Sequence, residues 1–259
     1  TADKVDTPEE MDEALKAGHA REKEIVEGAA TALIAAISET PNHPVAFITW
    51  YEAMAYCEWM TVRWRDRGWL DKHHNIRLPN EPEWEKAARG GIMLPEQPCL
   101  LEIQHLGAKS KLTVSPPLTQ TNEYPRRAYP WGNEISLSRM NILASGPRGI
   151  TPAGCFTNGR SPYGCLDMAG NVFEWTRSLW GPVWLSDDDH VYHSQLDFRY
   201  PYRLEDGRET TSADKDTGRI LRGGAWNHDH FFARCAVRSW VRPDAHFNYA
   251  GFRILVAPV

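Results

Sequence analysis

The triplet His228-Asp229-His230 combines residue types that could do chemistry. Two imidazoles and a carboxylate can ligate a transition metal. On a strand the two histidines would share one face, whereas in a loop the spacing does not fix their directions. No Gly-x-Ser-x-Gly turn accompanies them to indicate a serine nucleophile. We therefore expect polar contact residues here rather than a metal centre.

The five cysteines are an odd number, lie far apart and include no Cys-x-x-Cys pair; they are Cys57, Cys99, Cys155, Cys165 and Cys235. This spacing does not supply paired ligands for a zinc site. We expect reduced thiols, some of them buried as small apolar side chains, with one or two disulfides as the alternative.

The length of the chain suits one large domain or two small ones. The 259 residues carry a net charge of −5, which argues against a general nucleic-acid binder. No apolar run approaches the roughly 20 residues of a membrane-spanning helix. No secretory leader is visible, so we expect a cytoplasmic protein, a leader removed before Thr1 being the alternative. The 18 Pro, 19 Gly and 11 Trp indicate ordered loops held by large aromatic side chains.

The order of elements divides the chain into a helical lead-in, residues 1–42, and a main domain, residues 43–259. Capping boxes at Thr49 with Glu52 and at Asn80 with Glu83 predict two helices, the first continuing to Trp64 and the second to Arg89. After residue 94 no long amphipathic helix is expected. Short strands are predicted at residues 45–48, 172–176, 219–221, 234–238 and 252–256.

Several motifs rich in glycine and tryptophan follow one another in a specific order. They are His43-Pro44-Val45, Ile48-Thr49-Trp50-Tyr51-Glu52-Ala53, Arg77-Leu78-Pro79-Asn80-Glu81-Pro82-Glu83-Trp84, Tyr129-Pro130-Trp131-Gly132-Asn133, Asp167-Met168-Ala169-Gly170-Asn171-Val172-Phe173-Glu174-Trp175, Leu221-Arg222-Gly223-Gly224-Ala225-Trp226 and Gly251-Phe252-Arg253. Over residues 43–259 the chain resembles the formylglycine-generating-enzyme, or sulfatase-modifying-factor, family. The resemblance implies an α+β, C-type-lectin-like fold, with a small twisted antiparallel sheet flanked by two helices and many loops.

The resemblance also indicates which residues a catalyst of this family would need. Catalysts of this family hold copper between two cysteines that follow the Gly-Gly-aromatic turn, but residues 227–233 contain no cysteine. Cys235 matches a structural position, and one thiolate cannot give the two-sulfur site that copper(I) prefers. The iron-dependent relatives need histidines from an N-terminal bundle, where this chain has only His19. We expect no copper and no catalysis.

A calcium loop of the family is similar to residues 167–174. The implied ligands are the side chains of Asp167 and Glu174 and the carbonyls of Gly170 and Val172. Oxygen ligands of this kind suit Ca²⁺, which would fix the loop and take no part in a reaction.

The last 33 residues, 227–259, contain no Lys, Glu, Gln or Met, although the whole chain holds 8, 19, 4 and 6 of them, so that about five would be expected. Within residues 227–250 every residue except Trp240 belongs to a type encoded by a codon ending in a pyrimidine. This stretch resembles the variable region of diversity-generating-retroelement proteins, in which Asn codons are altered by adenine-specific copying. The resemblance implies a hypervariable, non-catalytic surface that binds a protein or another macromolecule.

On this interpretation the scaffold alternates with display residues. The scaffold positions are Arg234, Ala236, Arg238, Pro243 and Asp244. The display residues are expected to be exposed and are His228, Asp229, Phe232, Val237, Ser239, Trp240, Val241, Ala245, Phe247, Asn248 and Tyr249. Rigid aromatic groups would supply contact area, and the polar side chains adaptable hydrogen bonds. The alternatives are aromatic residues that belong to the core, a degenerate sensor or scaffold module of a larger intracellular protein, and an oxidoreductase using other residues.

Overall fold

The computed structural model describes residues 42–97, 118–186 and 191–259, so the predicted lead-in lies almost wholly outside the described residues. The described elements are α2 (Trp50–Asp66), β1 (His74–Arg77), α3 (Glu81–Arg89), β2 (Met93–Pro95), β3 (Thr119–Thr121), β4 (Phe173–Leu185), β5 (Tyr192–Ser194), β6 (Thr217–Arg222), β7 (Ser239–Val241), β8 (Ala250–Phe252) and β9 (Leu255–Pro258), with three short 3₁₀ turns between β3 and β4. The α+β class is confirmed.

Both described helices begin at the predicted capping boxes. The Thr49 hydroxyl accepts a hydrogen bond from the Glu52 amide (3.1 Å), and the Glu52 carboxylate accepts one from the Thr49 amide (2.7 Å). Asn80 and Glu83 make the same reciprocal pair (2.9 Å each way). Each pair satisfies amides that the first helical turn leaves free, which is why local sequence sufficed to locate both starts.

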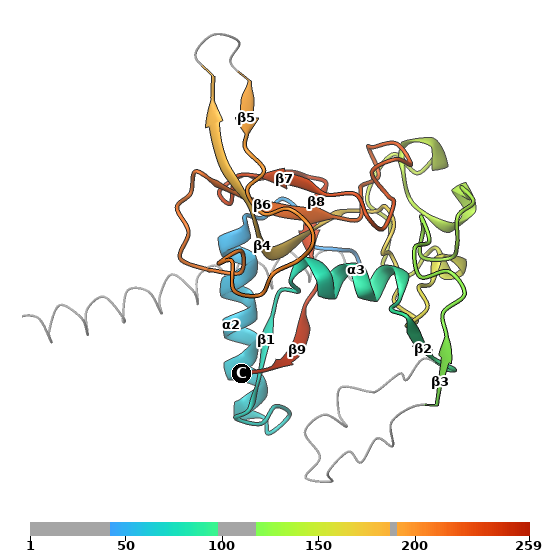
Figure 1. Cartoon of the computed structure of the whole chain (residues 1–259), viewed down its shortest axis with the longest axis horizontal. Helices are drawn as coiled ribbons and strands as arrows, with labels where there is room; N and C mark the ends of the chain where they lie inside the picture. Colours follow the sequence, from blue (N-terminus) through green and yellow to red (C-terminus); the bar gives the residue numbers. More distant parts are fainter. Residues whose placement is uncertain (1–41, 98–117, 187–190) are drawn as a thin grey trace, which may run out of the picture.

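A five-stranded sheet forms the centre, with strands in the order β5-β4-β6-β7 and β8 on β4 (Figure 1). All pairs are antiparallel except β4 with β8, which runs parallel from Phe173 opposite Ala250 to Trp175 opposite Phe252. The sheet is therefore mixed, not purely antiparallel as expected. The β4–β5 hairpin extends beyond the body of the molecule (Figure 1).

Two further strand pairs complete the fold. β1 pairs with β9 beside α2, and β2 pairs with β3 at the far end of α3 (Figure 1). The main core lies between α2 and the sheet, where Trp50 donates to the Thr176 carbonyl (2.9 Å) and Trp175 to the Ile48 carbonyl (3.2 Å). Each indole thus buries a large apolar ring while its N–H finds a partner.

Two of the predicted strands are absent, and a third is divided. Residues 45–48 are irregular because Phe47 has a φ of +64°, which interrupts an extended backbone. Residues 234–236 form a bend and a turn and residues 237–238 are irregular, so that the strand in that region, β7, begins later, at Ser239. The stretch 252–256 is shared between β8 and β9.

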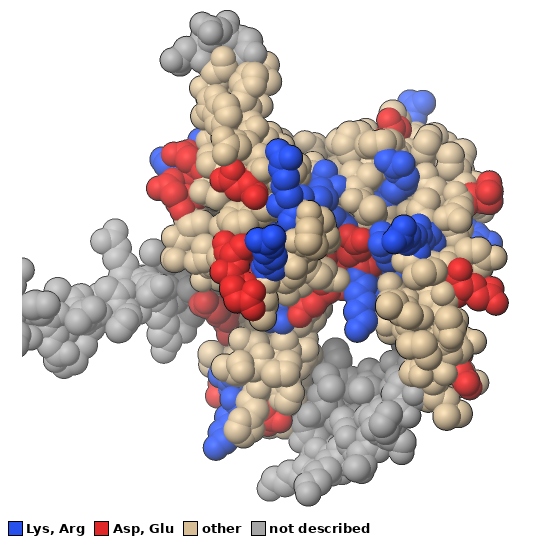
Figure 2. All heavy atoms as spheres, viewed as in Figure 1, with Lys and Arg blue, Asp and Glu red and all other residues tan. Residues whose placement is uncertain are grey.

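Basic and acidic side chains are interspersed over the described part of the face in Figure 2, without a broad region of one sign. No helix in the described ranges is long and apolar enough to cross a bilayer.

Candidate ligand-binding surface

Both ends of the segment 223–249 are fixed beside the same residue of β4. Glu174 lies opposite Arg222 of β6 on one side and opposite Gly251 of β8 on the other. The segment leaves the sheet through Gly223 and Gly224, whose φ angles are +96° and +73°. A Cβ at Gly224 would lie 2.8 Å from the Ala233 amide nitrogen, so glycine is required where the segment turns back on itself.

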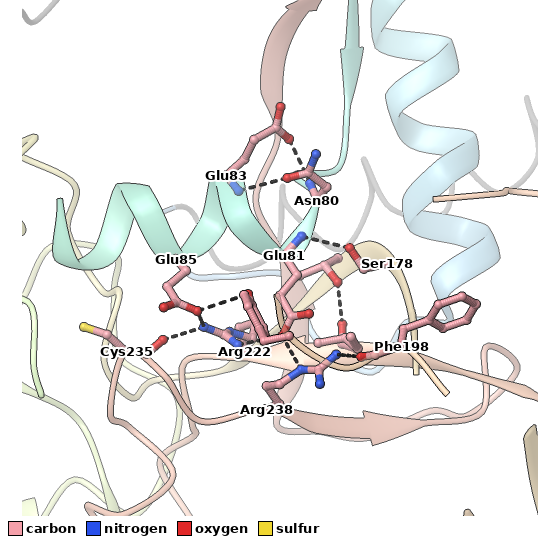
Figure 3. Close-up of polar contacts among 12 residues, drawn as sticks. Asn80, Glu81, Glu83, Glu85, Ser178, Phe198, Arg222, Cys235 and Arg238 are labelled. Atoms are coloured by element: carbon pink, nitrogen blue, oxygen red, sulfur yellow. Dashed lines mark hydrogen bonds and ion pairs between the residues drawn. The ribbon is translucent and has the colours of Figure 1, made fainter. Parts of the chain in front are cut away.

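A buried ion-pair network holds the segment against α3 (Figure 3). The fully buried Arg222 guanidinium donates to Glu81 Oε1 (2.7 Å), Glu85 Oε2 (2.7 Å) and the Cys235 carbonyl (2.5 Å), and lies 5.2 Å from the centre of the Trp84 ring. Because Arg222 ends β6 and Cys235 lies in the segment, one side chain joins the helix, the sheet and the segment.

The predicted scaffold positions differ in how firmly they are held. Arg238 donates to Glu81 Oε1 (2.5 Å) and to the Phe198 carbonyl (2.9 Å), and the carbonyl of the buried Pro243 accepts from the Trp50 amide (3.0 Å). Asp244 pairs with Arg242 (2.9 Å), Arg234 lies over the Phe231 ring, and Ala236 is exposed. Arg238 and Pro243 are therefore anchored to the body of the fold.

Five aromatic rings of the segment form a continuous surface feature, here called the aromatic strip. Its members are His228, Phe231, Phe232, Phe247 and Tyr249. Neighbouring ring centres lie 4.9–5.7 Å apart, with Phe247 stacked on Tyr249. The buried Phe173 of β4 lies beneath, 5.0 Å from the His228 ring and 6.2 Å from the Phe232 ring.

The aromatic strip continues into a groove of about 460 Å³. The groove lies between the β4–β5 hairpin and the turn after β7, and its lining residues include Tyr192, Trp240, Val241, Ala245 and Phe247. Arg242 and Asp244 also line it. Phe247 belongs to both the groove and the strip, so the two form one surface.

The eleven predicted display residues are less exposed than the sequence suggested. Asp229 and Asn248 are exposed, while the other nine are half-buried. The reason is that Phe232, Phe247 and Tyr249 pack one side of their rings against the main core and leave the other side outward. They are neither sealed in the interior nor fully displayed.

Sequence reasoning missed two contributors to this surface. Tyr192 of β5 is 47 % exposed and forms a wall of the groove, and Leu143, 56 % exposed, lies beside the aromatic strip because its amide donates to the His228 carbonyl (2.9 Å). Both depend on contacts with residues far away in the chain, for which the local sequence carries no signal.

The two histidines of the 228–230 triplet have separate partners. His228 Nδ1 lies 2.8 Å from Asn227 Oδ1, whereas His230 Nδ1 lies 3.1 Å from the Tyr129 hydroxyl. Burial lowers the pKa of His228, so its ring is neutral at pH 7. Within the described ranges, no three His, Cys, Asp or Glu side chains gather as a metal site.

The described cysteines are free thiols, and the two most buried are poor nucleophiles. Burial raises the pKa of both Cys57 and Cys235 to about 12, so each stays protonated at neutral pH. Cys235 lies within the segment, where its carbonyl accepts a hydrogen bond from Arg222.

Three of the four predicted calcium ligands, Asp167, Val172 and Glu174, line one cavity of about 640 Å³; Gly170 does not. Both oxygens of the Glu174 carboxylate accept hydrogen bonds from Arg253 (2.5 Å each), whereas Asp167 accepts one from the Gly154 amide (2.6 Å). Burial raises the pKa of Asp167, and its carboxylate makes no ion pair among the described residues. The oxygen donors fit Ca²⁺ in chemical class, but Glu174 would have to release Arg253 and the Trp84 indole N–H (2.5 Å) to ligate it, whereas Asp167 has no cation in contact.

Alanine substitutions should distinguish the buried from the exposed sides of the strip. We expect Phe232→Ala, Phe247→Ala and Tyr249→Ala each to lower the free energy of unfolding by about 1–2 kcal/mol, because only part of each ring is buried. Phe231→Ala should cost about 0.5 kcal/mol, since the Phe231 ring is 49 % exposed. Urea unfolding of the four variants measures this. Equal losses at all four positions would contradict this assignment of the rings.

Comparisons with known proteins agree with this fold. The profile of the sulfatase-modifying factor enzyme 1-like domain family matches residues 7–258. The solved structure of Treponema denticola variable protein 1 superimposes with a TM-score of 0.50 at 18 % identity, covering 84 % of this chain and 72 % of that one. The C-type-lectin-like fold expected from the motifs is thereby confirmed.

The curated proteins that resemble this chain are named for different activities. The formylglycine-generating enzyme of Thermomonospora curvata is 27 % identical, with 86 % of this chain and 58 % of that protein covered. Hercynine oxygenase of Mycolicibacterium smegmatis is 29 % identical (84 % and 39 %), and inactive Cα-formylglycine-generating enzyme 2 of Bos taurus is 27 % identical (84 % and 51 %). This chain therefore spans less than two thirds of each, and active and inactive proteins both resemble it.

Proposed function

The chain belongs to the sulfatase-modifying factor enzyme 1-like family, and from that premise we propose that it is a non-catalytic binding protein whose residues 227–250 present a variable surface to a protein ligand. The observation that carries the proposal is the aromatic strip, a row of half-exposed rings on a segment fixed at both ends. The expected lack of catalysis is supported by the absence of cysteine from residues 227–233.

The chemistry of the surface is that of a protein-binding site. Aromatic rings buried on one side lose little conformational freedom on binding, and they contribute disproportionately to protein–protein affinity. Around them Asp229, Asn248 and Arg242 provide polar groups at the edge. The strip and the groove together extend from Phe231 to Tyr192, which suits a macromolecule better than a small solute.

A selection experiment tests whether this surface can bind diverse proteins. We expect a yeast-displayed library, randomised at the eleven display positions with codons ending in pyrimidines, to yield folded binders of streptavidin and of lysozyme. A matched library randomised at exposed residues of α2 should yield few, because those residues line none of the cavities described above. Binders arising equally from both libraries, or folded members arising only from the α2 library, would contradict the proposal.

The surroundings of the gene test whether the surface varies in nature, and an activity assay tests independently whether the protein is a catalyst. The gene should lie beside a reverse transcriptase and a near-copy of its 3′ end that differs mainly at adenines. Incubation with copper and a cysteine peptide of the sulfatase type should give no aldehyde, because no cysteine pair is present in residues 227–233 to hold copper. Aldehyde formation would overturn the proposal that the protein is not a catalyst. A copy of the 3′ end that differs at all four bases equally would overturn the proposal that residues 227–250 are variable.

We further propose that Asp167 and Glu174 bind a structural calcium ion together with backbone carbonyls. Calcium should raise the melting temperature, with a stabilisation of about 2.7 kcal/mol at one hundred times its dissociation constant. Asp167→Ala should abolish this shift, because Asp167 is the carboxylate without a cation in contact, whereas the exposed Asp66→Ala should retain it. Thermal unfolding with and without chelator measures both. An equal shift in the two variants would exclude Asp167 as a ligand.

A further inference from the structure

We propose that the loop following β5 contains a binding site for an oxyanion, the phosphate or sulfate group of a ligand. The site is a cavity of about 380 Å³ whose lining includes Arg199, Arg203 and Arg208. It lies outside residues 227–250.

The carboxylates in this cavity are already occupied by other donors. Asp206 accepts hydrogen bonds from Arg208 Nε (3.0 Å) and Arg208 Nη2 (2.6 Å), which lowers the pKa of Asp206. Asp197 accepts one from Gln195 Nε2 (2.6 Å). The lining therefore has three guanidinium groups against two carboxylates. Neither carboxylate accepts a hydrogen bond from Arg199 or Arg203 among the described residues, although the charge of Arg203 also helps to lower the pKa of Asp206.

Two of the guanidinium groups have donors to spare. Within the described ranges Arg203 makes no hydrogen bond or ion pair, and Arg199 donates only to the Leu196 carbonyl, at 3.4 Å. A guanidinium group presents its N–H donors in a planar fork that fits a phosphate or sulfate group with two parallel hydrogen bonds.

The third guanidinium group has an unsatisfied nitrogen. The Arg208 side chain is 1 % exposed and is held near the rings of Tyr202 (4.6 Å) and Phe198 (5.7 Å). Its Nη2 also donates to the Arg199 carbonyl (2.9 Å), but Nη1 is buried without a hydrogen-bond partner. A buried donor of this kind is costly unless an acceptor reaches it. Because Arg208 lines the cavity, the proposal assigns this donor to an anion bound there.

The cavity can also accommodate the group that carries the anion. Its walls include Phe198 and Tyr200, and the Tyr200 side chain is 48 % exposed. The site adjoins the frame of the variable segment, because Arg238 donates to the Phe198 carbonyl (2.9 Å). A ligand bound by the variable surface could therefore also place an anionic group in this cavity, whose residues lie outside the variable segment.

Isothermal titration calorimetry of the full chain tests the site with two probes, inorganic phosphate and phenyl phosphate, at constant ionic strength. We expect saturable binding that Arg203→Gln weakens about tenfold, the effect of losing one charge-assisted hydrogen bond. Arg199→Gln should also weaken it, whereas Arg160→Gln, an exposed arginine in another loop, should not. Arg203 makes no hydrogen bond among the described residues and interacts with Asp206 only through its charge, so that variant should keep a melting temperature close to that of the wild type.

The two probes separate the sources of the anion. Tighter binding of phenyl phosphate would show that the aromatic walls recognise an anion carried by an organic group, and equal binding would assign the site to the free ion. Absence of saturable binding by either probe, or binding unchanged in both Arg199→Gln and Arg203→Gln, would overturn the proposal.

Discussion

Arg222→Ala should lower the free energy of unfolding by about 3–5 kcal/mol, the cost of removing one partner from a buried ion pair. The substitution leaves the buried Glu81 with Arg238 in place of two cations and removes the donors to Glu85 and to the Cys235 carbonyl. The melting temperature should fall by roughly 10 °C. Residues 227–238 should also become more accessible to hydrogen exchange, because the contact that ties Cys235 to β6 is lost.

Two further variants test whether this loss of stability comes from the contacts of the Arg222 guanidinium group. Arg222→Lys keeps the charge but cannot make all three contacts, so it should lie between the wild type and the alanine variant. Arg65→Ala removes an exposed arginine whose contact is one hydrogen bond to the His74 carbonyl, and it should cost less than 1 kcal/mol. An Arg222→Ala protein as stable as Arg65→Ala would show that the network in Figure 3 contributes specificity of the fold without net stability.

Phe173→Ala should have a comparably large effect, about 3–5 kcal/mol, because it removes a fully packed ring from the core. The ring lies beneath His228, Phe232 and Tyr249, so its loss also removes the floor of the aromatic strip. Binders selected on the wild-type surface should then lose affinity even at temperatures where the variant is folded. Chemical unfolding and titration of one selected target measure the two effects.

The matched control is Phe231→Ala, which deletes the same side chain from the outer edge of the strip. It should change stability little but still weaken those binders that contact the ring. If Phe173→Ala and Phe231→Ala altered stability equally, the division into a buried floor and an exposed strip would be wrong.

The sequence predicted the elements that depend on local contacts. The two helices could be located because Thr49, Glu52, Asn80 and Glu83 satisfy the first amides of each helix from within the same turn. The strand predicted at 45–48 failed because a positive φ at Phe47 cannot be inferred from a run of apolar residues. Its amide donates to the Phe247 carbonyl, a contact made across 200 positions of the chain.

The candidate site could be predicted only in part, because its geometry also depends on contacts between residues far apart in the chain. The unusual composition of residues 227–250 drew attention to the segment that bears the strip. Composition could not show that rings such as Phe232 and Tyr249 are half-buried, because that depends on packing against Phe173 in another strand. Nor could it indicate Tyr192, which enters the groove through the pairing of β4 with β5.

The attachment of both ends of segment 223–249 on either side of Glu174 has a consequence for how such proteins can diversify. A chain whose two ends are held at a fixed separation can gain or lose residues between them at low cost, since doubling a loop adds only about 0.6 kcal/mol of closure entropy. Insertions should be tolerated best at exposed positions such as Ala236 and Asp244. They should be tolerated least around Asn248, because Phe247 and Tyr249 on either side of it accept hydrogen bonds from the Phe47 and Phe173 amides. Homologous repertoires could therefore differ in loop length as well as in side chain, which would change the depth of the groove and the shapes of the ligands it accepts.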